Sequence, residues 1–160
     1  MSEPDWKEWG PPIRVRIEHG PVRLFARAVK DPNPLYASAR AAKAAGFSSV
    51  PCPPTFTFVM THAGAAPDLQ PGARAEPTTP DLTAGRGLYL HGEQEFVYHR
   101  HPVVGDVLEG RTRISLPQRK DGGRRPMELT WYQTQWCDLE GEPVVDELIT
   151  SVYLPDGAPG

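Results

Sequence analysis

Pro53-Pro54-Thr55-Phe56-Thr57-Phe58-Val59-Met60-Thr61-His62, residues 53–62, is the stretch that decides the fold of this 160-residue chain. It contains no lysine, arginine, aspartate or glutamate, and it continues into small residues at 63–66. Prolines suit the start of a helix, where the first amides have no partner inside the helix. A helix that is apolar on every side is usually buried, so we predict a buried helix over 54–66. The alternative is a buried strand, because Thr, Phe and Val also favour strands.

Around this stretch the chain divides into a mixed first half and a strand-rich second half. Alternation predicts a strand at 13–17, and helical spacing predicts a helix that Glu18 and Pro21 introduce and that ends at Lys30. A rigid Asp-Pro-Asn-Pro loop at 31–34 precedes a second helix at 37–45, which Gly46 ends. Strands with short turns between them are expected at 88–98, 107–116, 127–137 and 144–154.

These elements predict one α+β domain over residues 1–160, in which an antiparallel sheet of about five strands wraps around the central helix. Residues 1–11 form an irregular lead-in, and we expect Trp6 and Trp9 to attach it to the rest of the protein. Residues 67–87 form a long loop, and residues 155–160 form a frayed tail.

Composition excludes several classes of function. The net charge of -3 does not favour a nucleic-acid partner or a membrane surface, and no apolar run is long enough to span a bilayer. The acidic N-terminus is not a secretory signal, and two cysteines form no disulfide framework, so a cytoplasmic protein is expected. The spacing of the histidines matches no metal motif.

Several motifs together resemble the MaoC-like dehydratases, which have the hot-dog fold. They lie in order along the chain at residues 18–28, 31–36, 53–56 and 91–102, followed by Gly105-Asp106. The resemblance covers about residues 12–154. It is greatest to the N-terminal or accessory type, found as one subunit of mycobacterial-style 3-hydroxyacyl dehydratase pairs.

This resemblance implies an (R)-specific enoyl-thioester hydratase, or 3-hydroxyacyl-thioester dehydratase, acting on coenzyme A or carrier-protein thioesters without a further cofactor. In catalytic members, an Asp-x-Asn-Pro-x-His loop supplies an aspartate and a histidine that hold one water. A backbone amide at the start of the central helix stabilises the developing enolate. The resemblance places Asp31 and Tyr36 at the catalytic positions, and it places five residues at the substrate: Asn33, Pro54, Thr55, Phe56 and His91.

Two of these positions depart from the catalytic pattern. Tyr36 replaces the histidine, and a phenol is a poor base at neutral pH. Pro54 replaces the glycine and has no N–H to offer an oxyanion. The chain is therefore expected to be an accessory subunit that shapes the substrate tunnel, as a homodimer or as a heterodimer with a catalytic hot-dog subunit.

Other interpretations stay open. Asp31 has a simple role as a loop cap, and Tyr36 as a packed tyrosine. A replacement base among the central histidines is an alternative: His62, His91, His99 and His101. Arg86 and Arg100 are candidates for contact with phosphates, or are simply solvated. The same fold also hosts acyl-CoA thioesterases, and a non-catalytic acyl-thioester-binding homodimer is a third function.

Overall fold

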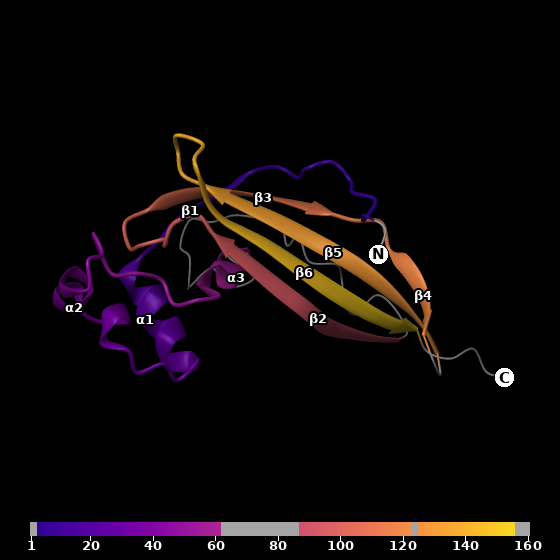
Figure 1. Ribbon diagram of the computed structural model, residues 1–160, viewed down its shortest axis with the longest axis horizontal. Coiled ribbons are helices and arrows are strands. Elements are labelled where there is room, and N and C mark those ends of the chain that lie inside the picture. The colour runs from indigo at the N-terminus through magenta and orange to yellow at the C-terminus, as the bar shows by residue number, and fades with distance from the viewer. Residues whose placement is uncertain (1–2, 62–86, 123–124, 156–160) are drawn as a thin grey trace.

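The computed structural model describes residues 3–61, 87–122 and 125–155 as one antiparallel sheet with short helices at one end (Figure 1). The elements follow in chain order: β1 (Ile13–Arg16), α1 (His19–Ala28), the 3₁₀ turn η1 (Pro34–Tyr36), α2 (Ala39–Ala44), α3 (Phe56–Thr61), β2 (Gly87–Tyr98), β3 (Val107–Ile114), β4 (Gln118–Gly122), β5 (Arg125–Cys137) and β6 (Pro143–Pro155). No helix in the described ranges is long and apolar enough to cross a membrane.

The sheet has the strand order β1-β3-β5-β6-β2, and β4 pairs with β5 at the far end. Every pairing is antiparallel. Figure 1 shows α3 beside the end of β2 that carries Tyr98, with α1 and α2 beyond that end. β2 forms one edge of the sheet, and a register shift between His91 and Glu93 interrupts its pairing with β6.

The core lies between α3 and the sheet. Phe56 and Met60 on α3 are buried in one cluster with Trp136 and Val145. Burial of a large apolar side chain stabilises the fold by roughly 1.5–3 kcal/mol, so these contacts hold the short helix in place. Gly110 on β3 makes room for the Trp136 ring, because a Cβ there would lie 2.6 Å from a ring carbon.

The predicted central helix is confirmed, but its start is corrected. α3 begins at Phe56 rather than at residue 54, because Thr55 has a φ of 69°, outside the helical region. Residues 62–66, which the prediction assigned to the same helix, lie outside the described residues, as do residues 67–86 of the predicted loop and 156–160 of the predicted tail.

Other boundaries differ for local reasons. The second helix begins at Ala39 rather than at 37, because η1 precedes it and the Ser38 hydroxyl accepts a hydrogen bond from the Ala41 N–H at 3.2 Å. The first helix begins at His19 and ends at Ala28. The short strand β4 was not predicted, since Gln118–Gly122 contains no apolar residue to reveal an alternation. It adds a sixth strand to the five expected.

The N-terminal lead-in contacts the outer side of β3, as Trp6 and Trp9 predicted. The Arg113 guanidinium carbon lies 4.5 Å from the Trp6 ring centre and 4.7 Å from the Trp9 ring centre. Backbone hydrogen bonds continue the contact, from Lys7 N–H to Ile114 O and from Gly10 N–H to Thr112 O. The lead-in therefore extends the pairing of β3 beyond the end of β1.

Candidate functional site

The loop before η1 is built from two consecutive turns closed by side chains. Asp31 Oδ1 accepts a hydrogen bond from the Asn33 N–H at 2.9 Å, and Asn33 Oδ1 accepts one from the Leu35 N–H at 3.1 Å. Pro32 and Pro34 have no N–H, so the amides of Asn33 and Leu35 are the two that donate to these side-chain oxygens. The turns direct Tyr36 inward, where its side chain is buried.

The approach to α3 is held against the 99–106 turn by backbone bonds. Cys52 N–H donates to Pro102 O at 2.9 Å, and Val104 N–H donates to Val50 O at 2.8 Å. Pro53 and Pro54 have no N–H, and the Thr55 N–H donates to the Tyr98 hydroxyl oxygen, with 3.1 Å between Thr55 N and Tyr98 Oη. The first available amide at this helix start is thus already bound by a side chain of β2.

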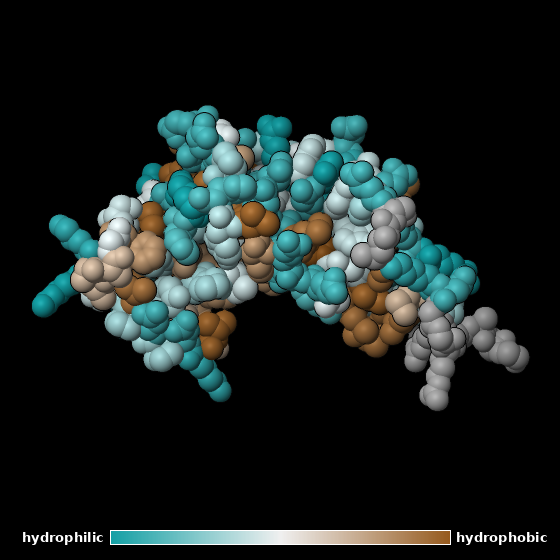
Figure 2. All heavy atoms as spheres, in the orientation of Figure 1, coloured by the Kyte–Doolittle hydropathy of each residue, from teal (hydrophilic) through white to brown (hydrophobic). Residues whose placement is uncertain are grey.

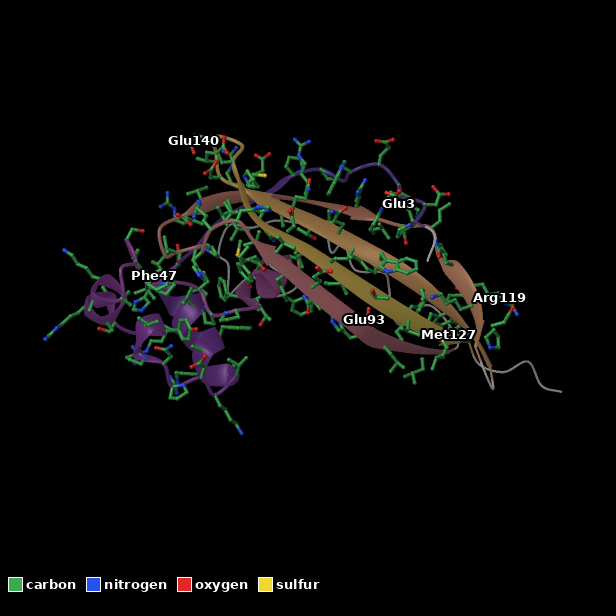
Figure 3. The ribbon with its side chains drawn as sticks, in the orientation of Figure 1. Glu3, Phe47, Glu93, Arg119, Met127 and Glu140 are labelled. Atoms are coloured by element: carbon green, nitrogen blue, oxygen red, sulfur yellow. The ribbon has the colours of Figure 1, made fainter. Side chains whose placement is uncertain are left out.

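A small cavity of about 100 Å³ opens between these two segments. Its walls come from η1, the 47–54 segment, the end of β2 and the 99–106 turn: Leu35, Tyr36, Phe47, Pro51, Cys52, Pro54, Tyr98 and His101. The His101 ring centre lies 5.5 Å from that of Phe47 and 6.1 Å from that of Tyr98. Figure 3 shows Phe47 at the end of the sheet where α1 and α2 lie.

Three titratable groups of the cavity, those of Tyr36, Tyr98 and Cys52, are poor bases and poor nucleophiles at neutral pH. Burial is the main cause that raises the pKa of Tyr36, and the charges of Asp31 and Tyr98 raise it further. Burial also raises the pKa of Tyr98, although the Thr55 N–H works in the opposite direction. Burial, with a smaller effect of Asp106, raises the pKa of the Cys52 thiol strongly. All three groups stay protonated, so the cavity offers O–H and S–H groups.

A second polar cluster lies in the core behind α3, around Glu147 on β6. This carboxyl is 1% exposed, and its Oε1 accepts a hydrogen bond from Gln94 Nε2 at 2.6 Å. Burial raises the pKa of Glu147 to about 7, although Gln94, Thr57 and Trp136 all favour the ionised form. Three buried atoms of this cluster nevertheless form no hydrogen bond within the described part of the chain: Glu147 Oε2, Thr57 Oγ1 and Trp136 Nε1.

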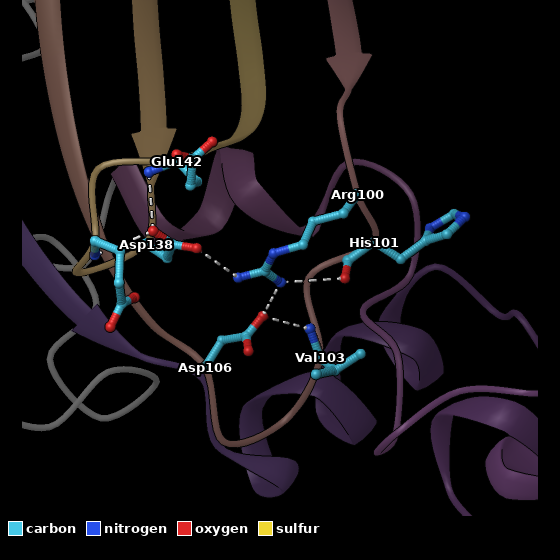
Figure 4. Close-up of polar contacts among 7 residues, drawn as sticks. Arg100, His101, Val103, Asp106, Asp138 and Glu142 are labelled. Atoms are coloured by element: carbon cyan, nitrogen blue, oxygen red, sulfur yellow. Dashed lines mark hydrogen bonds and ion pairs between the residues drawn. The ribbon is translucent and has the colours of Figure 1, made fainter.

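Within the described part of the chain, Arg100 connects two turns through its contacts with Asp106 and Asp138 (Figure 4). Its Nη1 lies 2.6 Å from Asp106 Oδ2, which also accepts a hydrogen bond from the Val103 N–H at 3.0 Å, and its Nη2 lies 3.8 Å from Asp138 Oδ2. These contacts tie the 99–106 turn to the turn between β5 and β6. The arginine is therefore already paired; Arg86 lies outside the described residues.

The structure brings together only some of the predicted site residues. Tyr36 and Pro54 line the cavity, Thr55 borders it through its amide, and Asp31 acts on Tyr36 through its charge. Asn33 is exposed and caps η1.

The remaining predicted residues lie elsewhere. Phe56 packs in the core against Phe25, with ring centres 5.6 Å apart. His91 lies outside the cavity, 6.0 Å from the Phe58 ring. Of the other histidines proposed as a base, His101 reaches the cavity, His99 Nε2 lies 2.8 Å from Asp146 Oδ2, and His62 is outside the described residues.

Tyr98 and Glu147 were missed by sequence reasoning. Tyr98 ends a predicted strand, and nothing in its neighbourhood indicates that this strand end meets the start of α3. Glu147 is adjacent to Asp146 in the sequence, and the pattern does not say which of the two faces the core. The one signal in the sequence that could have drawn attention to Tyr98 is the aromatic and histidine content of residues 96–101.

Comparison with known proteins gives a consistent result. The model of the FAS1-like, dehydratase domain region family matches residues 8–147. A UPF0336 protein of Parafrankia sp. (strain EAN1pec) is 37% identical over 136 residues, which is 84% of this chain and 80% of that protein. A UPF0336 protein of Thermobifida fusca (strain YX) is 32% identical over 139 residues, 87% of this chain and 84% of the relative.

Solved structures show the fold. A MaoC-like dehydratase has a TM-score of 0.70 and 27% identity, over 89% of this chain and 40% of that chain. The truncated HadBC (3R-hydroxyacyl-ACP dehydratase) complex of Mycobacterium tuberculosis has a TM-score of 0.71 and 21% identity, over 94% of this chain and 98% of that one. The ChsH1–ChsH2 complex of the same organism has a TM-score of 0.71 and 19% identity, over 93% and 90%. The predicted single hot-dog fold is confirmed.

Proposed function

Because the chain belongs to the FAS1-like dehydratase domain region family, we propose that it is the accessory subunit of a MaoC-like (R)-specific enoyl-thioester hydratase. In this reaction, hydroxide adds to C3 of a 2-enoyl thioester and a proton adds to C2; the reverse reaction is dehydration of a 3-hydroxyacyl thioester. A catalytic hot-dog partner supplies the aspartate and histidine, and this chain helps to hold the acyl thioester. The reaction leaves the redox state unchanged overall and needs no cofactor.

The observation that carries this proposal is the hydrogen bond from the Thr55 N–H to Tyr98 Oη at 3.1 Å. An oxyanion donor must be aimed at the position where charge develops, and here the amide at the helix start is already bound. Pro54 contributes no N–H at all. Loss of one oxyanion donor reduces a rate by roughly 10²–10³, which argues against independent turnover.

The 31–36 loop, which supplies the proton-transfer residues in catalytic members, supports the same division of roles. Tyr36 is buried, and its raised pKa keeps its phenol protonated at neutral pH. Asp31 Oδ1 is used in a turn with the Asn33 N–H. In this proposal the loop shapes one wall of the cavity, and the proton transfers belong to the partner, since loss of a general base costs roughly 10²–10⁴ in rate.

A partner subunit is supported by the edge strand β2. This strand has 12 residues and no neighbour on its outer side among the described residues. Figure 2 shows apolar side chains gathered over its end far from α1 and α2, where Leu88 is 52% and Leu90 is 43% exposed. An open edge of this kind pairs readily with another strand, and the HadBC and ChsH1–ChsH2 structures, which share this fold, are complexes of two proteins.

Co-expression with the product of the neighbouring gene tests the proposal. The chain alone is expected to show no hydration of crotonyl-CoA, followed by loss of enoyl absorbance. The purified pair is expected to show turnover and a mass equal to both chains together. Two control pairs each carry one aspartate-to-asparagine change. One pair has Asp31→Asn in this chain, and the other has the same change at the matching aspartate of the partner. Only the change in the partner is expected to abolish turnover.

Each other outcome contradicts the proposal in a distinct way. Full activity of the isolated chain, abolished by Asp31→Asn, would show that Tyr36 and Pro54 are compatible with catalysis. Release of free thiol from acyl-CoA would identify a thioesterase. A homodimer that binds acyl-CoA without turnover and ignores the neighbour would identify a non-catalytic binding protein.

A further inference from the structure

Two tyrosines line the same small cavity. Tyr36 comes from η1 and is 9% exposed, and Tyr98 comes from the end of β2 and is 37% exposed. The Tyr98 oxygen accepts a hydrogen bond from the Thr55 N–H. In the described ranges, however, neither hydroxyl donates its proton to another residue. A hydroxyl carries one O–H donor, so two donors are available at this cavity.

The remaining walls set the size and polarity of what these donors can meet. Leu35, Phe47, Pro51 and Pro54 are apolar, and the volume of about 100 Å³ accommodates roughly three water-sized groups. That room fits a carbonyl and its attached atoms, whereas a nucleotide is far too large. The Asp31 charge acts on Tyr36, so a carboxylate is disfavoured relative to a neutral acceptor.

The bond from Thr55 also strengthens one of the two donors. A hydroxyl that accepts a hydrogen bond is polarised, so its own O–H becomes a better donor. The Thr55 amide therefore strengthens the hydrogen bond that the Tyr98 hydroxyl can donate to a ligand in the cavity, although the amide does not itself contact that ligand. The Thr55 amide is fixed by the backbone before α3, which holds the phenol in place.

We propose that Tyr36 and Tyr98 bind the carbonyl oxygen of the acyl thioester through their hydroxyl protons. This inference rests on the proposed function and gives its substrate a specific contact. The two phenols act by positioning the thioester, without any transfer of their protons. The site selects a thioester over a ligand of the same shape that lacks the carbonyl oxygen.

A pair of matched probes tests this contact by isothermal titration at pH 7. S-butyryl-pantetheine has the carbonyl oxygen, and S-butyl-pantetheine lacks it. The wild-type protein, in the assembly in which it purifies, is expected to bind the thioester about 10-fold more tightly than the thioether, as two neutral hydrogen bonds predict. Tyr36→Phe and Tyr98→Phe should each reduce that ratio several-fold, and the double variant should abolish it.

Tyr89→Phe is the matched control, because it removes a phenol from β2 outside the cavity. It should leave the ratio unchanged, and no variant should change the affinity for the thioether. Each change removes only a hydroxyl, so the melting temperature should stay close to that of the wild type. If Tyr36→Phe fails to fold, the ratio of thioester to thioether affinity in Tyr98→Phe tests the proposal by itself.

The proposal is overturned if the wild-type protein binds both probes equally, binds neither, or keeps its ratio in the Tyr98→Phe variant. Its failure is separable from failure of the accessory role. A pair that hydrates crotonyl-CoA without probe discrimination would remove the tyrosine contact only. Discrimination without any productive partner would remove the accessory role and leave the contact.

Discussion

The Gln94 side-chain amide donates a hydrogen bond to the buried Glu147 carboxyl, with 2.6 Å between Gln94 Nε2 and Glu147 Oε1. This bond joins β2 to β6 behind α3. It leaves the second carboxyl oxygen without a direct hydrogen bond among the described residues. A buried charge that is only partly satisfied is costly, and the pKa of Glu147 rises to about 7 as a result.

Protein stability should therefore depend on pH through Glu147. The folded protein holds this proton more tightly than the unfolded chain, whose glutamate pKa is about 4.5. The stabilisation is complete below that lower value and is lost as pH rises through about 7, a change of about 3 kcal/mol. Urea unfolding of Glu147→Gln from pH 4.5 to 8 should lack this slope. The exposed Glu95→Gln is the control, and parallel curves for Glu147→Gln and wild type would contradict the prediction.

Gly110 should tolerate no side chain. A Cβ there would lie 2.6 Å from the Trp136 ring, which is fully buried. Overpacking of this kind costs roughly 1–3 kcal/mol, so Gly110→Ala should lower the free energy of unfolding by that amount. Gly20→Ala on α1 meets no heavy atom within 4 Å and should be neutral or stabilising, because alanine favours helices. Equal effects of the two changes in thermal unfolding would be inconsistent with this packing.

Thr55 holds a backbone conformation that suits glycine better. Its φ of 69° is left-handed, and a β-branched residue there costs roughly 1–2 kcal/mol. Thr55→Gly should raise the free energy of unfolding by about 1 kcal/mol, and it keeps the amide that binds Tyr98. Lys30→Gly, at a φ of 59°, should give a smaller gain because lysine is unbranched. Chemical denaturation checks both, and a loss of stability in Thr55→Gly would refute the strain.

Association through β2 should be sensitive to charge at its apolar end. Lysine on an edge strand opposes pairing with another strand, so Leu90→Lys should weaken the proposed assembly without unfolding the chain. Leu24→Lys on α1 is the matched control, because Leu24 is 51% exposed and lies away from the sheet edge. Sedimentation equilibrium measures the two masses. An unchanged assembly in Leu90→Lys, or equal weakening by Leu24→Lys, would rule out this edge.

The sequence predicted the elements whose signals are local. The uncharged stretch at 53–62 indicated a buried helix, and alternation located the long strands β5 and β6. Tyr36 and Pro54, the two positions that depart from the catalytic pattern, also line the cavity. These features depend on residue type and spacing within one segment, and such information is present in a single sequence.

Long-range contacts were not predictable from the same signals. The bond between Thr55 and Tyr98 joins residues 43 positions apart, and it depends on where β2 ends relative to α3. Glu147 looks like an ordinary surface carboxylate until β2, β5 and α3 are placed around it. β4 is polar throughout, and its pairing with β5 places it in the sheet. Tertiary packing decides all three.

The lead-in along β3 affects which edge of the sheet is free to pair with another strand. Residues 5–10 bond to β3 beyond β1 and occupy that rim, so β2 is the long strand that remains open among the described residues. The other edge of the sheet is β1, which has 4 residues, so the 12-residue β2 offers the longer row of backbone groups for pairing with another strand. Pairing through β2 would use this longer row in a two-sheet particle and leave the shorter β1 edge outermost.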